Sequence, residues 1–443
     1  MHRRSRLFFE ALRTQKLPRQ TRKYTNIPPG WKVRTVRDQT VGSVARIVGE
    51  MSGRLAGSLD GLQLDFREPQ TELHVGPSIS HSWLKLHLPF SSHEGLCKRY
   101  ELYSSRLLRP DKILEVMDVV AGDSALRFAA HDPGLRDLVA TNELILVTAA
   151  INRLDLQELS SDKDLEIVAY VSAARESSVE VTVELHQSIP GACCSLRGMS
   201  QFIFSARQQS AGGDLKRAVL SPLKPCTEHE QSLLLGKERS ATRHRESPEQ
   251  ETEFLEVSPH VLFSEHLQGL EGGGGARIPM QHYHSARIMH TQDKNPHTDI
   301  IFGGHLMRIA MELAGTAAFA FSGSIPTFRT LDRMSFLKPV KIGSVVNLLA
   351  STAYTFKHLI VVSVSMKMCN ASFETAVLTN RVDFVFQSNS TSPPPAVHPQ
   401  TDADHLLWLE GKRRMAQLLG SGLQLQTSTH ANTTHQCGDL KSA

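Results

Sequence analysis

The architecture of the chain follows from one segment, Asn295-Pro-His-Thr-Asp-Ile-Ile-Phe-Gly303-Gly304-His-Leu-Met-Arg-Ile-Ala-Met-Glu-Leu-Ala-Gly-Thr-Ala-Ala-Phe-Ala-Phe-Ser322. A polar, turn-prone run leads to a glycine pair, and a long apolar helix is predicted to start there. The apolar residues recur at helical spacing: Leu306, Ile309, Ala310, Leu313, Ala317 and Phe321. A helix that is apolar on most sides is buried on most sides, as happens when a sheet curls around it.

The glycine pair places two residues without side chains at the start of this helix. Backbone N–H groups at Gly303 and Gly304 can therefore approach a ligand oxygen closely, with the helix dipole behind them. Such a position suits a developing oxyanion. The alternative is that the glycines only let the helix pack tightly against a strand. The pair by itself leaves both interpretations open.

Length and composition limit the class of protein. At 443 residues, the chain is expected to hold more than one domain, or one domain with long irregular segments. No apolar run reaches the roughly 18 residues that a membrane helix needs, so stable membrane insertion is not expected. The six cysteines are scattered and show no C-x-x-C spacing. This pattern is typical of a reducing compartment without structural zinc.

Basic residues are concentrated at the N-terminus. Residues 1–37 contain 11 Lys/Arg and one acid, Glu10, whereas the whole chain has a net charge of only +4. The remainder is therefore mildly acidic, and no basic face for nucleic acid is expected. An Arg-rich, acid-poor start with one apolar helical side is typical of a mitochondrial presequence. The alternative is a disordered basic arm.

Two regions have a regular pattern of predicted elements. In the first, 80–206, the predicted helix is 110–130 and the predicted strands are Leu84–Leu88, Leu144–Asn152, Glu166–Ala173, Val179–Leu185 and Gln201–Ala206. In the second, 285–390, the predicted helix is 304–321 and the predicted strands are 327–337, 344–356, 358–369 and 372–386. The chain is therefore predicted to be α+β, with two copies of one helix-plus-sheet unit.

The remaining segments are irregular. Residues 207–280 are predicted to be a linker with a disordered insertion, because 237–253 are highly charged and Gly272–Gly275 is a flexible stretch. A C-terminal helix is predicted over 404–420, followed by a disordered tail.

Several motifs resemble those of a known family. Phe302-Gly-Gly-His-Leu-Met-Arg308, with Glu312-Leu-Ala314 after it, is similar to the Phe-Gly-Gly-x-Leu-Met-Arg…Glu-Leu-Ala motif of acyl-coenzyme A thioesterases of the hotdog fold. Phe336-Leu-Lys-Pro-Val-Lys-Ile-Gly343 resembles the Phe-x-x-Pro-Val-x-x-Gly strand-turn of that family. Segments 112–123 and 408–413 resemble those of the double-hotdog, mitochondrial acyl-coenzyme A thioesterase 9 group.

The resemblance implies a tandem hotdog, in which each unit wraps an antiparallel sheet around its helix and the two sheets pair. It also implies hydrolysis of acyl-CoA to a free fatty acid and CoA at a composite site between the units. Carried over by position, Asp118 is the catalytic carboxylate, and Gly303 and Gly304 form the oxyanion-binding position. Asn295 is the nearest candidate for the family's Asn. No cofactor or metal is implied, because CoA is part of the substrate.

Neighbouring residues compete for two of these roles. Asp123 is an alternative to Asp118 as the functional carboxylate, and Glu312 is either an orienting partner or a carboxylate at the edge of the core. Asn295 lies one position further from the glycine pair than the family's Asn, so Asp299 is an alternative to it.

Two further features bear on the site. The histidines around the glycine pair, among them His305, are expected at the surface, because no acidic ligands complete a metal site. Asp111 stands where the first helix of the family starts with glycine, which indicates one functional seam instead of two.

Three functions are compatible with these residues. The first is an acyl-CoA thioesterase of the mitochondrial matrix, a homo-oligomer that binds acyl-CoA and has neither nucleic acid nor membrane as a partner. The second is a hotdog hydratase. It is disfavoured because that chemistry uses a His/Asp pair on the helix, whereas helix 304–321 has only His305 at its start. The third is a non-catalytic hotdog protein that binds acyl-CoA or acts as a scaffold.

Overall fold

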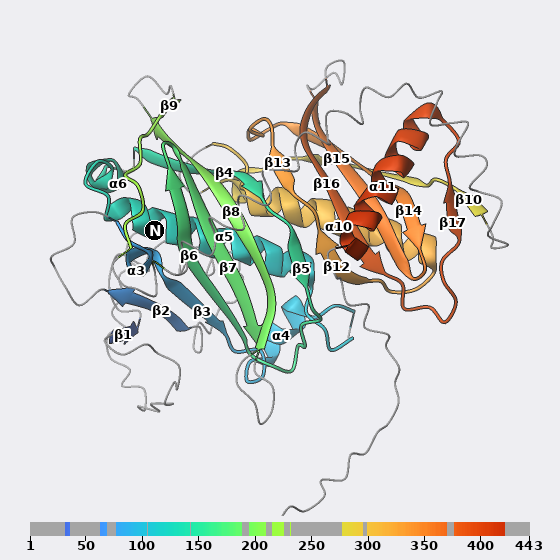
Figure 1. Cartoon of the computed structure of the whole chain (residues 1–443), viewed down its shortest axis with the longest axis horizontal. Coiled ribbons are helices and arrows are strands. Elements are labelled where there is room, and N and C mark those ends of the chain that lie inside the picture. Colours follow the sequence, from blue (N-terminus) through green and yellow to red (C-terminus); the bar gives the residue numbers. More distant parts are fainter. Residues whose placement is uncertain are drawn as a thin grey trace, which may run out of the picture.

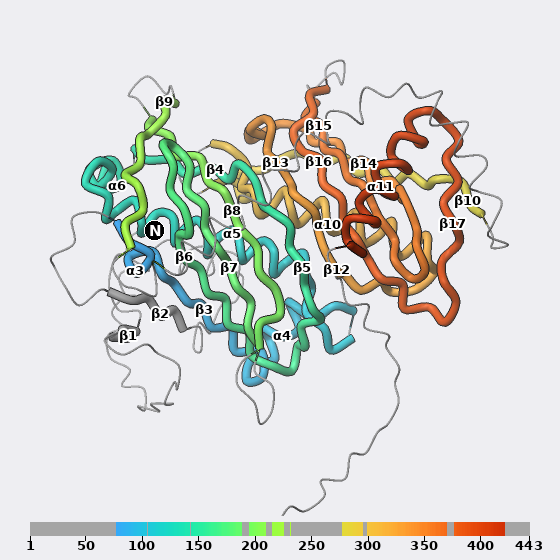
Figure 2. The backbone as a smooth tube through the Cα atoms, viewed as in Figure 1, coloured from blue at the N-terminus to red at the C-terminus, as the bar shows by residue number. Residues whose placement is uncertain are grey.

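A computed structural model of the chain describes residues 77–225 and 277–420, with gaps at 104, 142, 188–194, 210–214, 296–298 and 370–375. It also describes residue 231 and two N-terminal strands, β1 (Lys32–Thr35) and β2 (Gln63–Glu68). The described part forms two units that lie side by side and follow one another along the chain (Figure 1, Figure 2).

The first unit is a curved antiparallel sheet packed on the helix α5 (Pro110–Ala130). Its strands lie in the order β3–β6–β7–β8–β4, with the bounds β3 (Leu84–Leu88), β4 (Leu144–Ile151), β6 (Leu165–Arg175), β7 (Ser178–Gln187) and β8 (Ser195–Gln209). Apolar residues alternate along β7, so Val179, Val181, Val183 and Leu185 are all fully buried. The shorter elements are α3 (Ile79–Ser82), α4 (Glu94–Tyr100), α6 (Arg136–Ala140), β5 (Leu154–Leu156) and β9 (Leu215–Arg217).

The second unit repeats this plan around α10 (Gly303–Ser322). Its strands lie in the order β13–β16–β15–β14–β11, with the bounds β11 (His282–Ile288), β13 (Met334–Phe336), β14 (Val345–Phe356), β15 (Leu359–Cys369) and β16 (Ala376–Gln387). The helix α11 (Asp402–Gly420) covers the opposite face of β14 and β15 from α10 (Figure 1). The shorter elements are β10 (Arg277–Pro279), η3 (Thr291–Asp293), β12 (Thr327–Leu331) and β17 (Ala396–His398).

The two sheets join edge to edge into one continuous sheet. Strand β4 pairs with β13, where Ile151 lies opposite Met334. Strand β5 pairs with β12, where Leu154 lies opposite Leu331. The two antiparallel ladders are exchanged by a pseudo-two-fold axis at the seam, because β4 and β5 occupy in the first unit the places of β12 and β13 in the second. The paired tandem hotdog implied by the resemblance is therefore present.

A pair of matching β-bulges supports this pseudo-symmetry. The ladder between β4 and β8 shifts register between Thr148 and Ala150. The ladder between β12 and β16 shifts between Phe328 and Thr330. A bulge bends its strand, and the bulge of β4 lies at the contact of the two units, because Thr148 there bonds Asp118 on α5 and faces Gly303 on α10.

Most predicted elements are confirmed, including α5, α10, α11 and the strands β3, β4, β6, β7 and β8. The single strand predicted over 327–337 is wrong: the structure has β12 and β13 there, because the chain crosses from one seam ladder to the other. Strand β11 was not expected, because its sequence is mostly polar and exposed and shows no apolar alternation. The predicted insertion at 237–253, the tail after 420 and residues 1–31 lie outside the described residues.

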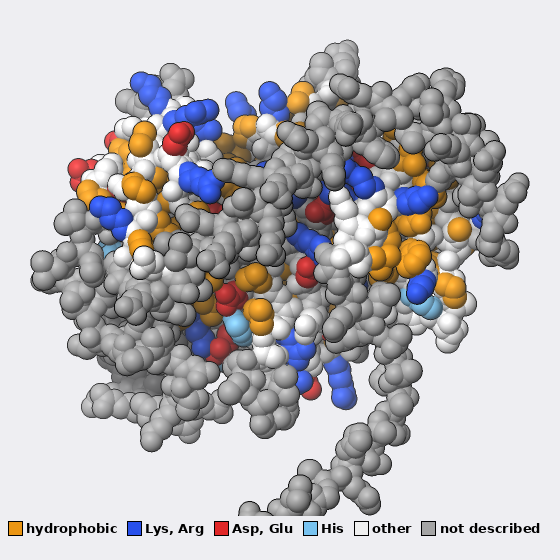
Figure 3. Space-filling model, in the orientation of Figure 1, with side chains coloured by type: hydrophobic (Ala, Val, Ile, Leu, Met, Phe, Trp, Pro, Cys, Tyr) orange, Lys and Arg blue, Asp and Glu red, His pale blue; other side chains and the backbone are white. Residues whose placement is uncertain are grey.

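The surface carries both signs of charge. On the face that Figure 3 shows, Lys and Arg side chains are interspersed with Asp, Glu and apolar side chains over both units. None of the helices in the described part of the chain is both long enough and apolar enough to cross a membrane.

Candidate active site

Asp118 lies at the seam between the two units. Its side chain is completely buried on α5. The hydroxyl of Thr148, at the bulge of β4, donates a hydrogen bond of 3.0 Å to Asp118 Oδ1. The backbone N–H of Gly304, in the first turn of α10, donates to the same carboxylate. One residue from each unit therefore holds this side chain.

The first amides of α10 are not used by the helix itself. The N-cap residue is Phe302, whose side chain accepts no hydrogen bond from them. The first helical hydrogen bond runs from Leu306 N–H to Phe302 O, so the amides of residues 303–305 precede the ladder. Asp118 takes the place of a capping side chain, but it does so from the other unit.

Both glycines lie where a side chain would not fit. A Cβ on Gly303 would be 2.9 Å from Thr148 Cβ and 3.2 Å from Asp118 Oδ2. A Cβ on Gly304 would be 3.1 Å from the backbone oxygen of Glu115 on α5. The interpretation that the glycines permit close packing is therefore confirmed, and that packing brings the first turn of α10 to Asp118. Their role in binding an oxyanion stays a prediction.

The buried environment changes the acidity of Asp118. Burial raises its pKa from 3.8 to about 7, while the hydrogen bonds from Thr148 and Gly304 oppose that shift and the charge of Glu115 adds to it. A carboxyl group that titrates near neutral pH can accept and release a proton in the physiological range, which general acid–base chemistry requires.

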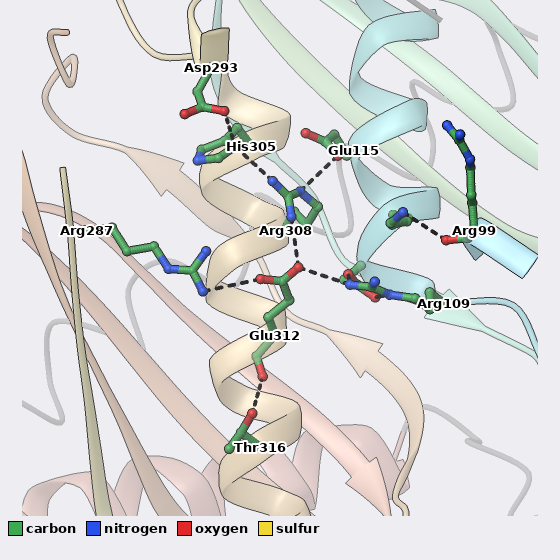
Figure 4. Close-up of polar contacts among 11 residues, drawn as sticks. Arg99, Arg109, Glu115, Arg287, Asp293, His305, Arg308, Glu312 and Thr316 are labelled. Carbon is green, nitrogen blue, oxygen red and sulfur yellow. Dashed lines mark hydrogen bonds and ion pairs between the residues drawn. The ribbon is translucent and has the colours of Figure 1, made fainter. Parts of the chain in front are cut away.

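A network of ion pairs joins α5 to α10 (Figure 4). Arg308 Nε is 3.0 Å from Glu115 Oε2, and Arg308 Nη1 donates to Glu312 Oε1 at 2.9 Å. Glu312 also accepts a hydrogen bond of 3.0 Å from Arg109 and lies 3.5 Å from Arg287 Nη2. Three guanidinium groups therefore surround Glu312, which favours its alternative interpretation as a carboxylate at the edge of the core.

His305 is buried, and the expectation of a surface histidine is wrong for this residue. It occupies the first turn of α10, which faces the seam, and only 7% of it is exposed. Arg308 Nη2 donates to His305 Nδ1 at 3.1 Å, and burial lowers the pKa of His305 to about 4. Because a guanidinium group only donates, the ring is neutral, and Asp293 Oδ1 at 3.4 Å from the same nitrogen does not form a charged pair with it.

The pseudo-symmetric position across the seam has different chemistry. The axis relates Asp118, Gly304 and Thr148 to Met311, Asp111 and Phe328, respectively. Met311 and Phe328 are buried apolar side chains, and Asp111 is paired with Arg109. The second position thus lacks the carboxylate, the glycine and the hydroxyl, which supports the inference from Asp111 that the chain has one functional seam.

Three of the four predicted site residues, Asp118, Gly303 and Gly304, come together at the seam. Asn295 lies on the loop before α10, where its backbone N–H donates to Ile300 O at 2.8 Å. Its role stays a prediction. The alternative, Asp299, has a side chain that is 90% exposed and lies 3.8 Å from Lys294 Nζ.

Sequence reasoning did not identify Thr148 or the pair of Glu115 and Arg308. The signal for Thr148 was its position as the one hydroxyl residue in the apolar run of β4. Asp123, the alternative to Asp118, is also buried on α5, five residues further along the helix. Among the residues that the structure describes, no group of three His, Cys, Asp or Glu is arranged to hold a metal ion.

Comparisons with known proteins find similar chains and a similar fold. Residues 298–367 match the model of the thioesterase superfamily. The chain is 29% identical to chloroplastic acyl-coenzyme A thioesterase 2 of Humulus lupulus over 337 residues, 72% of this chain and 75% of that protein. It is 26% identical to mitochondrial acyl-coenzyme A thioesterase 9 of Homo sapiens over 360 residues, 77% and 79% of the two chains. An acyl-CoA hydrolase of Staphylococcus aureus, solved with butyryl coenzyme A, coenzyme A and coenzyme A disulfide, superimposes with a TM-score of 0.30 at 24% identity over 33% of this chain and 94% of that chain.

Proposed function

We propose that this chain, which belongs to the thioesterase superfamily and is a relative of acyl-coenzyme A thioesterase 9, hydrolyses acyl-CoA to a free fatty acid and CoA. The observation that carries the proposal is the contact of Asp118 of the first unit with the first turn of α10 in the second, where Asp118 Oδ2 would lie 3.2 Å from a Cβ on Gly303 and the carboxylate accepts from the Gly304 N–H. Thioester hydrolysis needs a base for water and a donor for the carbonyl oxygen. The seam supplies both: Asp118 is the base, and the first amides of α10 beside it are the donors.

In the proposed reaction, Asp118 accepts a proton from water, and the hydroxide attacks the thioester carbonyl carbon. Negative charge then develops on the carbonyl oxygen, and the amide of Gly304 or His305 at the α10 N-terminus stabilises it. Collapse of the tetrahedral intermediate breaks the C–S bond, and the proton on Asp118 passes to the CoA sulfur. Thr148 keeps the carboxylate oriented, and Asn295 orients water or substrate.

Direct attack by Asp118 on the thioester is the alternative first step. It would form a mixed anhydride and release CoA before water enters. Hydroxylamine traps a mixed anhydride, so an Asp118 hydroxamate found by mass spectrometry would replace the base mechanism with this one.

The same proposal covers the cofactor requirement, the location and the assembly of the enzyme. The reaction uses no cofactor, because water and acyl-CoA are the only reactants. The basic residues 1–37 and the mitochondrial relative support a place in the mitochondrial matrix, which fractionation of mitochondria with protease protection tests. The resemblance also implies a homo-oligomer, which light scattering of the purified chain tests.

The deciding experiment measures release of free CoA thiol from a panel of acyl-CoA chain lengths. The full chain is compared with Asp118→Asn. Asparagine keeps an oxygen that accepts hydrogen bonds from Thr148 and Gly304, so the seam should stay folded while the base is lost. We expect at least about a hundredfold loss of kcat, because a general base contributes about 10²–10⁴-fold.

Met311→Leu is the matched control, since Met311 occupies the pseudo-equivalent position on α10 and makes no proposed contact with substrate. It should retain full turnover. Turnover that survives Asp118→Asn would move the base elsewhere, with Asp123 as the first residue to test. A wild-type chain that binds acyl-CoA but turns over no chain length would instead be a non-catalytic binding protein.

A further inference from the structure

Glu115 and Arg308 occupy a special place in the pseudo-symmetry. Glu115 is the sixth residue of α5, and Arg308 is the sixth residue of α10. The axis that exchanges the helices therefore exchanges these two positions, and the contact between them lies on the axis itself.

The helix register behind this statement has an independent check. Gly122 and Gly315 are each the thirteenth residue of their helix. A Cβ on Gly122 would lie 3.8 Å from the ring of Phe204 on β8, and a Cβ on Gly315 would lie 3.9 Å from the ring of Phe386 on β16. The two helices thus meet their own sheets at matching points, as the pseudo-symmetry requires.

Two charged side chains at positions that the axis exchanges attract each other only if the two units carry opposite charges there. If two copies of the first unit paired in this way, Glu115 would face another Glu115. Two copies of the second unit would place Arg308 against Arg308. With one unit of each kind, the opposite charges meet at 3.0 Å with side chains only 15% and 22% exposed, where little water screens them.

The pair also stands one helical turn from each half of the proposed site. Glu115 precedes Asp118 by three residues on α5, and Arg308 follows Gly304 by four on α10. Arg308 further donates to His305 Nδ1, in the first turn of α10. As Figure 4 shows, its guanidinium group lies between the two helices and reaches Glu115 on one side.

We propose that Glu115 and Arg308 are positioning residues: their asymmetric contact sets the register of α5 against α10 and so holds the α10 amides against Asp118. The proposal deepens the proposed function, and its effect on catalysis rests on that function. The register of the two helices does not depend on the proposed function, and coupling in the urea midpoint measures it separately.

The test is a double-mutant cycle in the full chain with Glu115→Gln, Arg308→Gln and the double variant. For each protein, the urea midpoint, kcat, KM and the pH profile of kcat/KM are measured. Arg308→Gln leaves the Glu115 carboxylate buried near Asp111 and Glu312, so kcat should fall about tenfold or more with a smaller change in KM. The double variant should lose less than the product of the two single losses, in both midpoint and kcat.

The pH profile separates positioning near Asp118 from a general loss of stability. Glu115 is the one charged side chain that affects the pKa of Asp118 in the described structure. Glu115→Gln removes that negative charge, so the midpoint of the profile should move down by about 0.3–1 pH unit. The expected shift is that of Glu115→Gln, because Arg308 acts on the buried Glu115 carboxyl, whose pKa burial raises and Arg308 lowers.

Glu94→Gln and Lys98→Gln form the matched control cycle, because this ion pair is exposed on α4 and is not part of the network that joins α5 to α10. Both should leave midpoint and kcat unchanged. Single losses that multiply in the double variant would overturn the proposal, and so would an unmoved pH profile beside a lowered urea midpoint. A wild-type chain without turnover would refute the proposed function, and coupling in the urea midpoint would then still decide whether the pair sets the helix register.

Discussion

Asp118 is subject to opposing influences at the scale of a single residue. Complete burial favours the protonated carboxylic acid, whereas the donors on Thr148 and Gly304 favour the carboxylate. Burial is the larger influence, and the pKa lies at about 7. The side chain is therefore poised between its two protonation states at physiological pH, which suits a base that must return its proton to the leaving thiolate.

This poise predicts a rise of activity with pH. If Asp118 accepts the proton from water, kcat/KM should increase through about pH 7 and then become constant, because only the ionised carboxylate can act. Initial rates with one acyl-CoA between pH 5 and 9 measure it. A profile that is flat over this range would contradict the assignment of Asp118 as the base.

The same group should make stability depend on pH with a defined sign. The pKa is about 7 in the folded chain and 3.8 when unperturbed, so between these values the folded state binds the extra proton. The free energy of unfolding therefore falls as pH rises from about 4 to about 7, by up to about 4 kcal/mol. Asp118→Asn lacks this contribution, so its stability relative to wild type should improve over that window in urea titrations.

At the scale of the element, α10 contains two kinds of glycine. Gly303 faces Thr148 and Asp118 so closely that no Cβ fits. Gly315 lies in the middle of the helix, where a Cβ would make an ordinary contact of 3.9 Å with Phe386. The first glycine is required by the approach of the two units, whereas the second leaves room for a methyl group.

Alanine at these two positions should have opposite effects. Gly303→Ala should push the first turn of α10 away from Thr148 and lower kcat at least about tenfold, because the amides no longer align with Asp118. Gly315→Ala should keep kcat and raise the free energy of unfolding by up to about 1 kcal/mol, because alanine favours helix. Thiol-release kinetics and urea titrations of both variants measure this. Equal kcat values in the two variants would show that close packing at Gly303 does not matter for the chemistry.

At the scale of the whole molecule, the two units share one sheet and one core. The ladders β4–β13 and β5–β12 make the sheet continuous, and a single apolar cluster extends from Leu84 in β3 to Trp408 in α11. Separating the units would expose both seam ladders and the contact of α5 with α10. We therefore expect the units to unfold together.

Tryptophan fluorescence can test this cooperativity, because Trp83 reports on the first unit and Trp408 on the second. Trp31→Phe combined with either Trp83→Phe or Trp408→Phe leaves one reporter in each protein. In each of the two proteins, the urea midpoint from tryptophan fluorescence should equal the urea midpoint from circular dichroism. A fluorescence transition that precedes the circular-dichroism transition in one protein would show that its unit unfolds first.

Much of this molecule was readable from local patterns. The apolar period of 110–130 and 304–321 located both central helices, and alternation located most strands, because these patterns reflect burial that each element needs wherever it packs. The glycine pair and Asp118 were identified through motifs whose chemistry depends on residue type and order. Strand β11 and the split into β12 and β13 were not readable, since partner strands determine them.

The contacts across the seam were decided by the tertiary structure alone. Asp118 and Gly304 are far apart in the chain. Only the packing of α5 on α10 lets the carboxylate on α5 accept a hydrogen bond from the first turn of α10. The same packing buries Asp118, moves its pKa toward neutrality and turns Glu115 and Arg308 into a pair. Thr148 reaches Asp118 from β4 of its own unit, which is also a contact that only the fold creates. Sequence patterns determined the residue types and the helices that carry them, whereas burial and distance, on which acidity and hydrogen bonding depend, exist only once the two units meet.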